Sequence, residues 1–337
     1  MTQQLPPPVQ LMHMLFGFAA SRAIGFAAEL GIADRVKNQS KSAEELAHET
    51  SMHPRSLYRL LRACASVGVF REDEAKRFSL TPLAEPLLSD TPGSLRAFAT
   101  MINTDWQFQT WAHLPYSVET GKPAFDKVHG MSSFDYFWSN EKAGKTFNDA
   151  MTSNSAFSSA AVLDAYDFSG ISTLVDVGGG HGLLLASILK RYPNLQGILF
   201  DMPAITVQAK DLIDSYGVSD RCERMGGDFF TAVAARGDAY IMKHIIHDWN
   251  DEQCITILEN CRNAMTTGGK VLVVEMIIPE GNEPSIGKFI DLQMLLYLPG
   301  CERTEAEYRI LFDKAGFELT RIVPTMSPFS IVEGVCR

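Results

Sequence analysis

The chain has 337 residues, of which 46% are apolar and 21% are charged. This length is typical of about two domains. The composition is that of an ordinary globular protein, which excludes a disordered chain, a collagen-like chain and a small disulfide scaffold. The formal net charge is −10. Proteins that bind nucleic acid over their whole surface usually carry the opposite sign, so nucleic acid and anionic membranes are both disfavoured as partners.

Six cysteines are scattered along the chain, and none forms a Cys-x-x-Cys pair. This pattern is typical of free thiols in a reducing compartment rather than of a disulfide framework. No basic and then apolar secretory signal opens the sequence. We therefore expect a cytoplasmic protein.

The first apolar stretch covers residues 11–33 and is interrupted by His13, Arg22 and Glu29. These interruptions favour a pair of buried or interfacial helices over a membrane span. Apolar side chains recur here at helical spacing, at Leu11, Leu15, Phe18 and Phe26. Since so little polar surface lies between them, the helices must be covered by their own domain or by a second subunit. We predict a homodimer that forms through these helices.

Residues 1–100 are predicted to form a helical domain with the outline of a winged helix. Ser42, followed three residues later by an acid, is a helix N-cap signature. A second helix begins at Pro54 and is stopped by Gly68, and a short hairpin is expected over residues 69–80.

A winged helix also suggests DNA binding through its second helix, which contains Arg55, Arg59 and Arg62. The alternative is that this domain serves for packing and dimerisation. The acidity of the whole chain favours the second interpretation, because the fold alone does not define a function.

Residues 101–165 are rich in aromatic side chains and are punctuated by Gly121, Pro123 and Gly130. This pattern predicts short helices that alternate with turns. The aromatic side chains can pack between two domains, or they can line an apolar pocket for an aromatic ligand. Different faces of one segment can do both.

From about residue 170 short apolar runs alternate with helical periods, which is typical of a parallel sheet with crossover helices. The apolar runs cover residues 173–177, 197–201, 239–243 and 270–275, and two crossover helices are expected over 183–192 and 251–265. Polar residues end or follow these runs, and they include Asp176, Asp201, Asp228, Lys243 and Glu275. Ligands bind at the carboxyl ends of the strands in such sheets, so we expect a site at this edge.

The sharpest motif is Asp-Val-Gly-Gly-Gly-His-Gly at residues 176–182. Its glycines allow a tight turn close to a ligand at a helix N-terminus. The third glycine of the dinucleotide motif is replaced by Leu183, and the lysine of a P-loop is absent. Asp201 follows Asp176 by 25 residues, where an acid can accept hydrogen bonds from both hydroxyls of a ribose. The pattern therefore indicates a nucleoside ligand without a diphosphate.

Five segments together resemble the S-adenosylmethionine-dependent O-methyltransferases, in the branch that contains caffeic acid, flavonoid and hydroxyindole O-methyltransferases and bacterial natural-product enzymes. The segments are 174–182 (LVDVGGGHG), 200–203 (FDMP), 227–230 (GDFF), 242–249 (MKHIIHDW) and 302–304 (ERT). The resemblance covers nearly the whole chain. It implies an α/β fold, with a Rossmann-like class I methyltransferase sheet and an N-terminal all-α winged-helix dimerisation domain.

This resemblance implies three segments: a dimerisation domain over residues 1–100, a helical linker and substrate-pocket segment over 101–165, and a catalytic domain that binds S-adenosylmethionine over 166–337. It also implies the roles of individual residues. The cofactor-binding residues are Ser155, Gly178, Asp201, Asp228, Phe229 and Lys243. The catalytic residues are His247 as general base, with Glu275 and Glu302 beside it. The substrate-binding residues are Met101, Met151, Asn154 and Met294.

Two departures from the family pattern affect the substrate. Phe229 replaces a methionine beside adenine and keeps an apolar contact, whereas Leu298 replaces an asparagine of the plant pocket. We therefore expect methylation of a hydroxyl, most simply a phenol, on a small aromatic or polyketide-like acceptor of secondary metabolism, but no particular phenylpropanoid.

Other functions use the same fold. The chain could methylate a carboxyl, nitrogen or carbon, could hydroxylate or decarboxylate with the cofactor bound, or could be a ligand-sensing regulator. The retained His247, Glu275 and Glu302 favour methylation of oxygen. His244 and His247 could suggest a metal pair, but no third ligand follows at a recognisable spacing, so we predict no metal.

Overall fold

The computed structural model describes residues 5–91 and 93–337; residues 1–4 and 92, which fall inside the predicted N-terminal domain, lie outside the described residues. The chain contains two compact units. The first unit comprises Met1–Ala112 and Phe134–Asn154, and the second comprises His113–Ser133 and Ser155–Arg337. The division of the chain at residues 100 and 165 stays a prediction.

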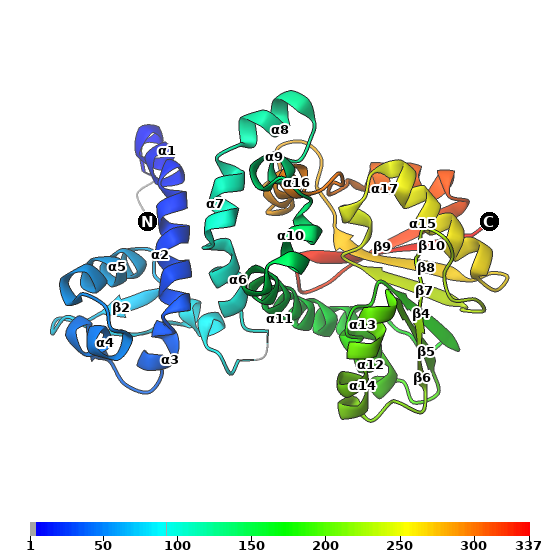
Figure 1. Ribbon diagram of the computed structural model, residues 1–337, viewed down its shortest axis with the longest axis horizontal. Coiled ribbons are helices and arrows are strands. Elements are labelled where there is room, and N and C mark those ends of the chain that lie inside the picture. Colours follow the sequence, from blue (N-terminus) through cyan, green and yellow to red (C-terminus); the bar gives the residue numbers. More distant parts are fainter. Residues whose placement is uncertain (1–4, 92) are drawn as a thin grey trace. The chain divides into compact units, whose positions relative to one another are not determined.

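The first unit begins with helices and a small sheet, as the sequence predicts (Figure 1). Ser42 Oγ accepts a hydrogen bond from Glu45 N, and Glu45 binds back to Ser42 N, so the predicted cap forms a full capping box. The hairpin pairs its two strands antiparallel next to the second helix of the winged helix. The elements are α1 Pro7–Leu15, α2 Gly17–Glu29, α3 Ile32–Val36, β1 Lys41–Ser42, α4 Ala43–Thr50, α5 Pro54–Ser66, β2 Phe70–Glu72, β3 Arg77–Leu80 and η1 Pro82–Leu87.

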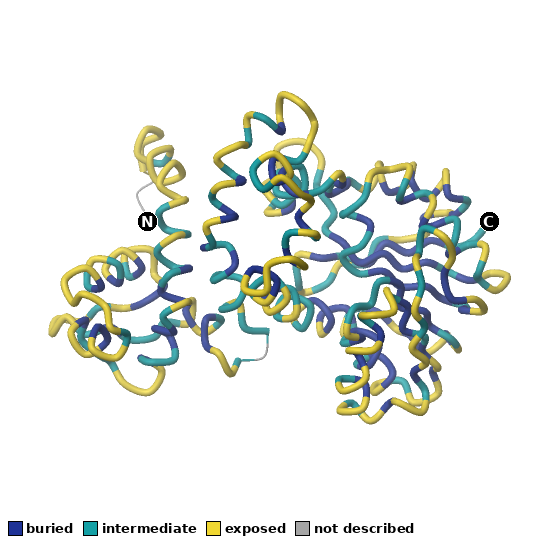
Figure 2. Tube along the Cα trace, in the orientation of Figure 1, coloured by how far each residue is buried: buried dark blue, intermediate teal, exposed yellow. Residues whose placement is uncertain are grey.

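The core of the first unit lies between α2, α4, α5 and the hairpin, where Ala28, Leu46, Leu61 and Phe78 are buried. Helix α1, by contrast, has no buried residue, and Figure 2 shows most of it as exposed. Large apolar side chains are exposed along α1 and the start of α2, at Leu11, Met12, Met14, Leu15, Phe16 and Phe18. Of the stripe that the sequence predicts to need a cover, Leu11, Leu15 and Phe18 are therefore left exposed by the core of their own unit, whereas Phe26 is half-buried.

Among the described residues, no single helix has the length and hydropathy of a membrane span. Helices α1 and α2 meet that test only when they are taken together, and the chain bends by 42° between them.

The middle of the chain differs in part from its prediction. Short helices do follow one another as far as residue 139, in α6 Arg96–Ile102, α7 Asp105–Trp111, α8 Leu114–Thr120, α9 Ala124–His129 and α10 Ser133–Ser139. The expectation of short helices up to residue 165 is wrong, because the single helix α11 covers Glu141–Ala165. No glycine or proline occurs between Gly144 and Gly170, so nothing in the sequence interrupts this helix.

The second unit contains a seven-stranded sheet with the strand order β6-β5-β4-β7-β8-β10-β9. The first five strands in this order are parallel, and β10 runs antiparallel to β8 and β9. The four predicted apolar runs all form strands. The strands are β4 Thr173–Val177, β5 Gln196–Asp201, β6 Cys222–Gly226, β7 Ala239–Lys243, β8 Lys270–Met276, β9 Phe317–Pro324 and β10 Phe329–Cys336.

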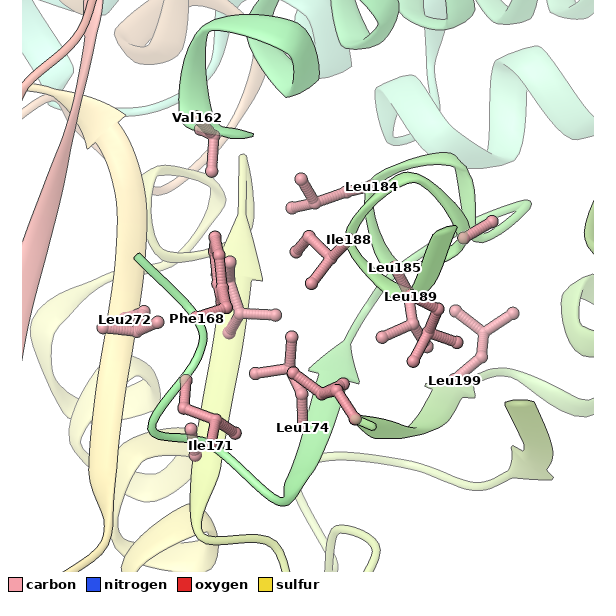
Figure 3. Close-up of a cluster of buried hydrophobic side chains, with 14 of the residues drawn as sticks. Val162, Phe168, Ile171, Leu174, Leu184, Leu185, Ile188, Leu189, Leu199 and Leu272 are labelled. Atoms are coloured by element: carbon pink, nitrogen blue, oxygen red, sulfur yellow. The ribbon is translucent and has the colours of Figure 1, made fainter. Parts of the chain in front are cut away.

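Both faces of this sheet are covered by apolar helix surfaces. Figure 3 shows one face, where Leu184, Ile188 and Leu189 of α12 pack near Leu174. The other face packs against α15 and α17. Since the strands are buried on both sides, they read as continuous apolar runs. The helices of this unit are α12 Leu183–Arg191, α13 Pro203–Gln208, α14 Lys210–Tyr216, η2 Ile246–Asp248, α15 Asp251–Ala264, α16 Gly287–Tyr297 and α17 Glu305–Lys314.

The carboxyl ends of the parallel strands lie at the same edge of the sheet. Asp176 and Asp201 are near the ends of β4 and β5, Lys243 ends β7, and Glu275 is near the end of β8. The polar residues that the sequence places after separate apolar runs therefore share one edge.

Candidate active site

The glycine turn after β4 has a backbone conformation that favours glycine. The φ angles of Gly178, Gly180 and Gly182 are 69°, 59° and 81°, all in the left-handed region. A Cβ at Gly178 would lie 2.4 Å from Cδ1 of Ile245, which follows β7. The turn is therefore in close contact with the segment that leads to His247.

Asp201 binds this turn directly. Its Oδ2 accepts a hydrogen bond from Gly180 N at 2.8 Å, and its Oδ1 accepts one from Met202 N at 2.7 Å. Burial raises the pKa of this carboxyl, while the two backbone donors oppose the shift. A carboxylate has about four acceptor positions, so both oxygens keep a free position for the hydroxyls of a ribose.

Asp176, near the end of β4, is a further candidate that the resemblance to the family does not assign to the site. Its residue is 1% exposed, and its Oδ2 has no hydrogen-bond partner among the described residues. Burial raises the pKa of this carboxyl to about 7, although the charge of Lys243 opposes the shift. A buried acceptor without a partner beside a glycine turn suits a ligand that brings a donor or a positive charge. Its place before the glycine motif is the signal that could have identified it.

Lys243 and Ser155 lie together in the second unit. Lys243 Nζ donates a hydrogen bond to Ser155 Oγ at 2.9 Å. Burial lowers the pKa of Lys243 to about 8, while the nearby charges of Asp176 and Glu275 favour the protonated amine. Two residues predicted to bind the cofactor, Lys243 and Ser155, are therefore in contact, and Asp176, the acid before the glycine turn, is close to Lys243.

Asp228 and Phe229 follow β6. The carboxylate of Asp228 is exposed and accepts a hydrogen bond from Phe230 N at 2.9 Å, which orders the local loop. The ring of Phe229 lies 3.8 Å from the Cβ position of Gly178 and packs edge-on against Trp249. The structure therefore brings Phe229 of this predicted adenine-binding pair to the glycine turn, while Asp228 orders the loop beside it.

His247 belongs to the short turn η2, which follows β7. Its Nδ1 lies 2.8 Å from Glu302 Oε1 and 3.4 Å from Glu275 Oε2. Glu275 Oε1 also accepts hydrogen bonds from Ile245 N at 3.0 Å and from His247 N at 3.3 Å. The structure thus brings together three residues that are separated by up to 55 positions in the sequence.

The charges around His247 favour its protonated form. Burial alone would lower the pKa of His247, but the carboxylates of Glu275, Asp248 and Glu302 overcome this effect and raise it to about 10. Burial in turn raises the pKa of Glu275 to about 7, although His247 opposes that shift. A carboxylate at Nδ1 fixes the tautomer of the ring, so Nε2, which lies 3.4 Å from Asp248 Oδ1, is the proton acceptor when the ring is neutral.

His244 shares this cluster but makes no side-chain hydrogen bond within the described part of the chain, and its Nε2 is buried without a partner. Its φ is 58°, which is uncommon for histidine. Ligand atoms of His244, His247 and Glu275 lie within 4.8 Å of one another, so they could hold a metal ion. The fold therefore brings a third possible ligand, Glu275, to the two histidines, which sequence spacing did not reveal, and the expectation that no metal binds stays a prediction.

The residues predicted to line the substrate pocket belong to both units. Met101 lies in α6 and is buried, while Met151 and Asn154 lie in α11 and are half-buried; all three belong to the first unit. Met294 lies in α16 of the second unit and is half-buried. Their meeting in one pocket stays a prediction.

The fold and this edge of the sheet together define an enzyme that binds a nucleoside-type cofactor on a doubly wound α/β sheet. The family model of the O-methyltransferase domain matches residues 111–318, and that of the O-methyltransferase dimerisation domain matches residues 12–90. The chain belongs to the O-methyltransferase family, and it is an O-methyltransferase with a Rossmann-like class I fold and an N-terminal dimerisation domain.

The chain is also similar to individual proteins over nearly its whole length. It is 45% identical to the phenazine O-methyltransferase PhzM of Lysobacter antibioticus, over 96% of this chain and 94% of that protein. It is 36% identical to the O-demethylpuromycin O-methyltransferase of Streptomyces alboniger, over 96% and 88% of the two chains.

Solved structures agree with this similarity. The structure of LaPhzM superimposes with a TM-score of 0.90 at 44% identity, and covers 99% of this chain and 100% of that one. The calicheamicin-biosynthesis methyltransferase CalO1, solved in its SAH-bound form, has a TM-score of 0.90 at 33% identity with the same coverage.

Proposed function

We propose that the chain transfers a methyl group from S-adenosylmethionine to a phenolic hydroxyl of a small aromatic natural product, with His247 as the general base. The observation that carries this proposal is the contact of His247 Nδ1 with Glu302 Oε1 at 2.8 Å. His247 follows Ile245, whose side chain lies against the glycine turn. The two relatives are named as a phenazine O-methyltransferase and an O-demethylpuromycin O-methyltransferase, which supports an aromatic acceptor.

The cofactor supplies a methyl group that is already activated on a positively charged sulfur. The residues that would hold it are Gly178, Asp201, Asp228, Phe229, Lys243 and Ser155. Asp176, which is buried beside the glycine turn, joins this set. Asp201 keeps an open acceptor position on each oxygen, and the unpartnered oxygen of Asp176 adds another. These donor and acceptor groups fit a ribose and a charged amino-acid end.

The chain's own contribution is to orient the acceptor and to take its proton. A phenol has a pKa of about 10, and the carboxylates raise the pKa of His247 to about 10, so proton transfer between the two groups costs little free energy. Only the neutral imidazole can accept the proton. The reaction should therefore become faster as the pH rises towards the pKa of His247, with removal of the proton accompanying attack on the methyl group.

The resemblance to the family assigns Met101, Met151, Asn154 and Met294 to the substrate. Three thioethers and one amide are side chains that suit contact with a flat aromatic acceptor. The particular compound requires a direct assay. A set of phenols should be incubated with the full-length chain and S-adenosylmethionine, and the products checked by mass spectrometry for the gain of one methyl group. A carboxylic acid or amine analogue that is methylated while every phenol fails would contradict the proposal.

We further propose that the chain acts as a homodimer in the cytoplasm and belongs to secondary metabolism. The match to a dimerisation domain and the exposed apolar side chains of α1 support the dimer, because monomers rarely leave such a patch in water. Light scattering on the full-length chain tests this state.

A further inference from the structure

The segment 300–303 contacts the backbone of the His247 turn as well as the ring of His247. Glu302 contacts the ring itself, as described above. Gly300 and Arg303, on either side of Glu302, contact the backbone of the turn instead. Neither residue has a part in the function proposed so far.

Gly300 is buried directly against the backbone of the turn. A Cβ at this position would lie 2.0 Å from the carbonyl oxygen of His247, 2.5 Å from the carbonyl carbon of Asp248 and 2.5 Å from Trp249 N. All three atoms belong to the main chain, so no side chain can rotate away to make space. Any residue larger than glycine must therefore displace the turn or the segment 300–303.

Arg303 holds the same turn through hydrogen bonds. Its Nη1 donates to Ile246 O at 3.1 Å and its Nη2 donates to Trp249 O at 3.0 Å, so the guanidinium binds the carbonyls on both sides of His247. Its side chain is only 2% exposed, and Asp251 Oδ1 accepts from its Nε and Nη2 at 3.1 and 2.8 Å. The planar fork of arginine can satisfy these acceptors together, which the single ammonium of lysine cannot do.

The segment that carries these contacts is itself fixed at several points. Arg303 O accepts a hydrogen bond from Ile278 N at 3.0 Å, just after β8, and Glu302 N donates to Asp291 Oδ1 of α16 at 2.9 Å. Thr304 caps α17 in a capping box with Glu307. The segment is therefore a rigid support rather than a loose loop.

We propose that Gly300 and Arg303 are positioning residues for methyl transfer, which hold the backbone of the His247 turn from two sides so that the imidazole stays against Glu302. This inference rests on the proposed role of His247 as the base. The distance of 2.8 Å between His247 Nδ1 and Glu302 Oε1 is then maintained by the contacts of the turn and not by that hydrogen bond alone.

The decisive variant is Gly300→Ala, and Gly170→Ala is its matched control. Neither glycine has a left-handed φ, and a Cβ at Gly170 would meet nothing within 4 Å. We expect Gly300→Ala to lower kcat by about 10–100-fold, because a displacement of about 1 Å at a catalytic group can cost about 10²-fold. The Kd of S-adenosylmethionine, measured by calorimetry, should be unchanged in both variants.

Two further readouts separate positioning from a merely structural role. In Gly300→Ala the pH at which kcat/KM is half-maximal should fall, because His247 loses part of its contact with a carboxylate. In the His247→Ala background, Gly300→Ala should cause no additional loss of kcat, since its effect acts through His247. Arg303→Lys should keep more activity than Arg303→Met, and it serves as the second test if Gly300→Ala does not fold.

The inference is overturned if folded Gly300→Ala has the kcat of Gly170→Ala, or if its loss persists in the His247→Ala background. A parallel loss of kcat, cofactor affinity and Tm would also overturn it, as would equal activity of the two Arg303 variants. If His247→Ala alone keeps normal turnover, the proposed base is wrong. If His247→Ala is inactive but Gly300→Ala has normal turnover, only the positioning role of Gly300 is wrong.

Discussion

At the scale of single residues, Glu275 and Glu302 contact the same histidine in different ways. Glu302 binds the ring at Nδ1, whereas Glu275 accepts hydrogen bonds from the backbone of the turn and lies 3.4 Å from the ring nitrogen. Loss of either carboxylate should therefore lower the pKa of His247, but only loss of Glu302 should also remove a hydrogen bond from the ring.

Glu302→Gln should shift the pH profile of kcat/KM to lower pH. The Glu302 carboxylate is among the groups that raise the pKa of His247, so its removal lowers that pKa and leaves the base neutral at a lower pH. The maximal rate should also fall, because the imidazolium that forms during the reaction loses a partner. The profiles of the wild type and the variant should be measured with one phenol. Superimposable profiles would contradict the assignment.

Asp201→Ala should weaken the binding of S-adenosylmethionine. The loss expected for hydrogen bonds to a charged acceptor is about 1.5–3 kcal/mol. Asp214→Ala is a suitable control, because Asp214 is a carboxylate of α14 that forms an ion pair with Lys210 on the surface. Calorimetry that gives the wild-type Kd for Asp201→Ala would show that this acid does not hold the ribose.

The site residues differ in how far the sequence could predict them. The glycine turn and the strand-end residues, Glu275 among them, follow from local patterns, and the resemblance to a family added His247 and Glu302. Asp176, Gly300 and Arg303 were not assigned to the site. Gly300 and Arg303 act by contacting a turn more than 50 positions away, and no spacing rule describes such a contact.

At the scale of secondary-structure elements, local chemistry explains the elements that were predicted well. The capping box at Ser42 and the four apolar runs depend on residues close together in sequence. Strands β9 and β10 were not predicted. β10 pairs antiparallel with β8 and with β9, and such pairing between distant segments leaves no local pattern in the sequence. Helix α11 is longer than the predicted short helices because the glycines and prolines that indicate turns all lie at or before residue 144, and the rest of the segment contains none.

The glycine turn allows a paired test at this scale. Gly178→Ala must adopt a left-handed φ and also place its Cβ 2.4 Å from Ile245 Cδ1, whereas Gly180→Ala must adopt a left-handed φ in open space. The backbone cost alone is about 1–2 kcal/mol. Gly178→Ala should therefore lose more cofactor affinity and more turnover than Gly180→Ala. Equal losses in the two variants would show that contact with the segment before His247 is unimportant.

At the scale of the whole molecule, the exposed apolar side chains of α1 and early α2 are the feature that a lone chain does not explain. They include Met14, Leu15 and Phe18, each more than half exposed. An interface between two subunits would bury them, as obligate dimer interfaces resemble a core cut in half.

Replacing Leu15 and Phe18 together by aspartate should convert the dimer to a monomer. Charged groups in an apolar interface lose hydration without gaining partners, so association becomes unfavourable. Multi-angle light scattering of the full-length chain measures the mass directly, and Val118→Asp is a control with an equally exposed apolar residue elsewhere. A wild-type chain that is monomeric at micromolar concentration would contradict the homodimer.

The central claim is that this O-methyltransferase uses His247 to take the proton of a phenol. The most direct test is the turnover of His247→Ala with a phenol that the wild type methylates. Turnover is measured by mass spectrometry of the methylated product, with a metal chelator present throughout. The account predicts a fall in kcat of at least about 10²-fold, the lower end for a lost general base. It also predicts wild-type affinity for S-adenosylmethionine, since His247 is not among the residues assigned to the cofactor. Near-normal turnover of folded His247→Ala would contradict the claim.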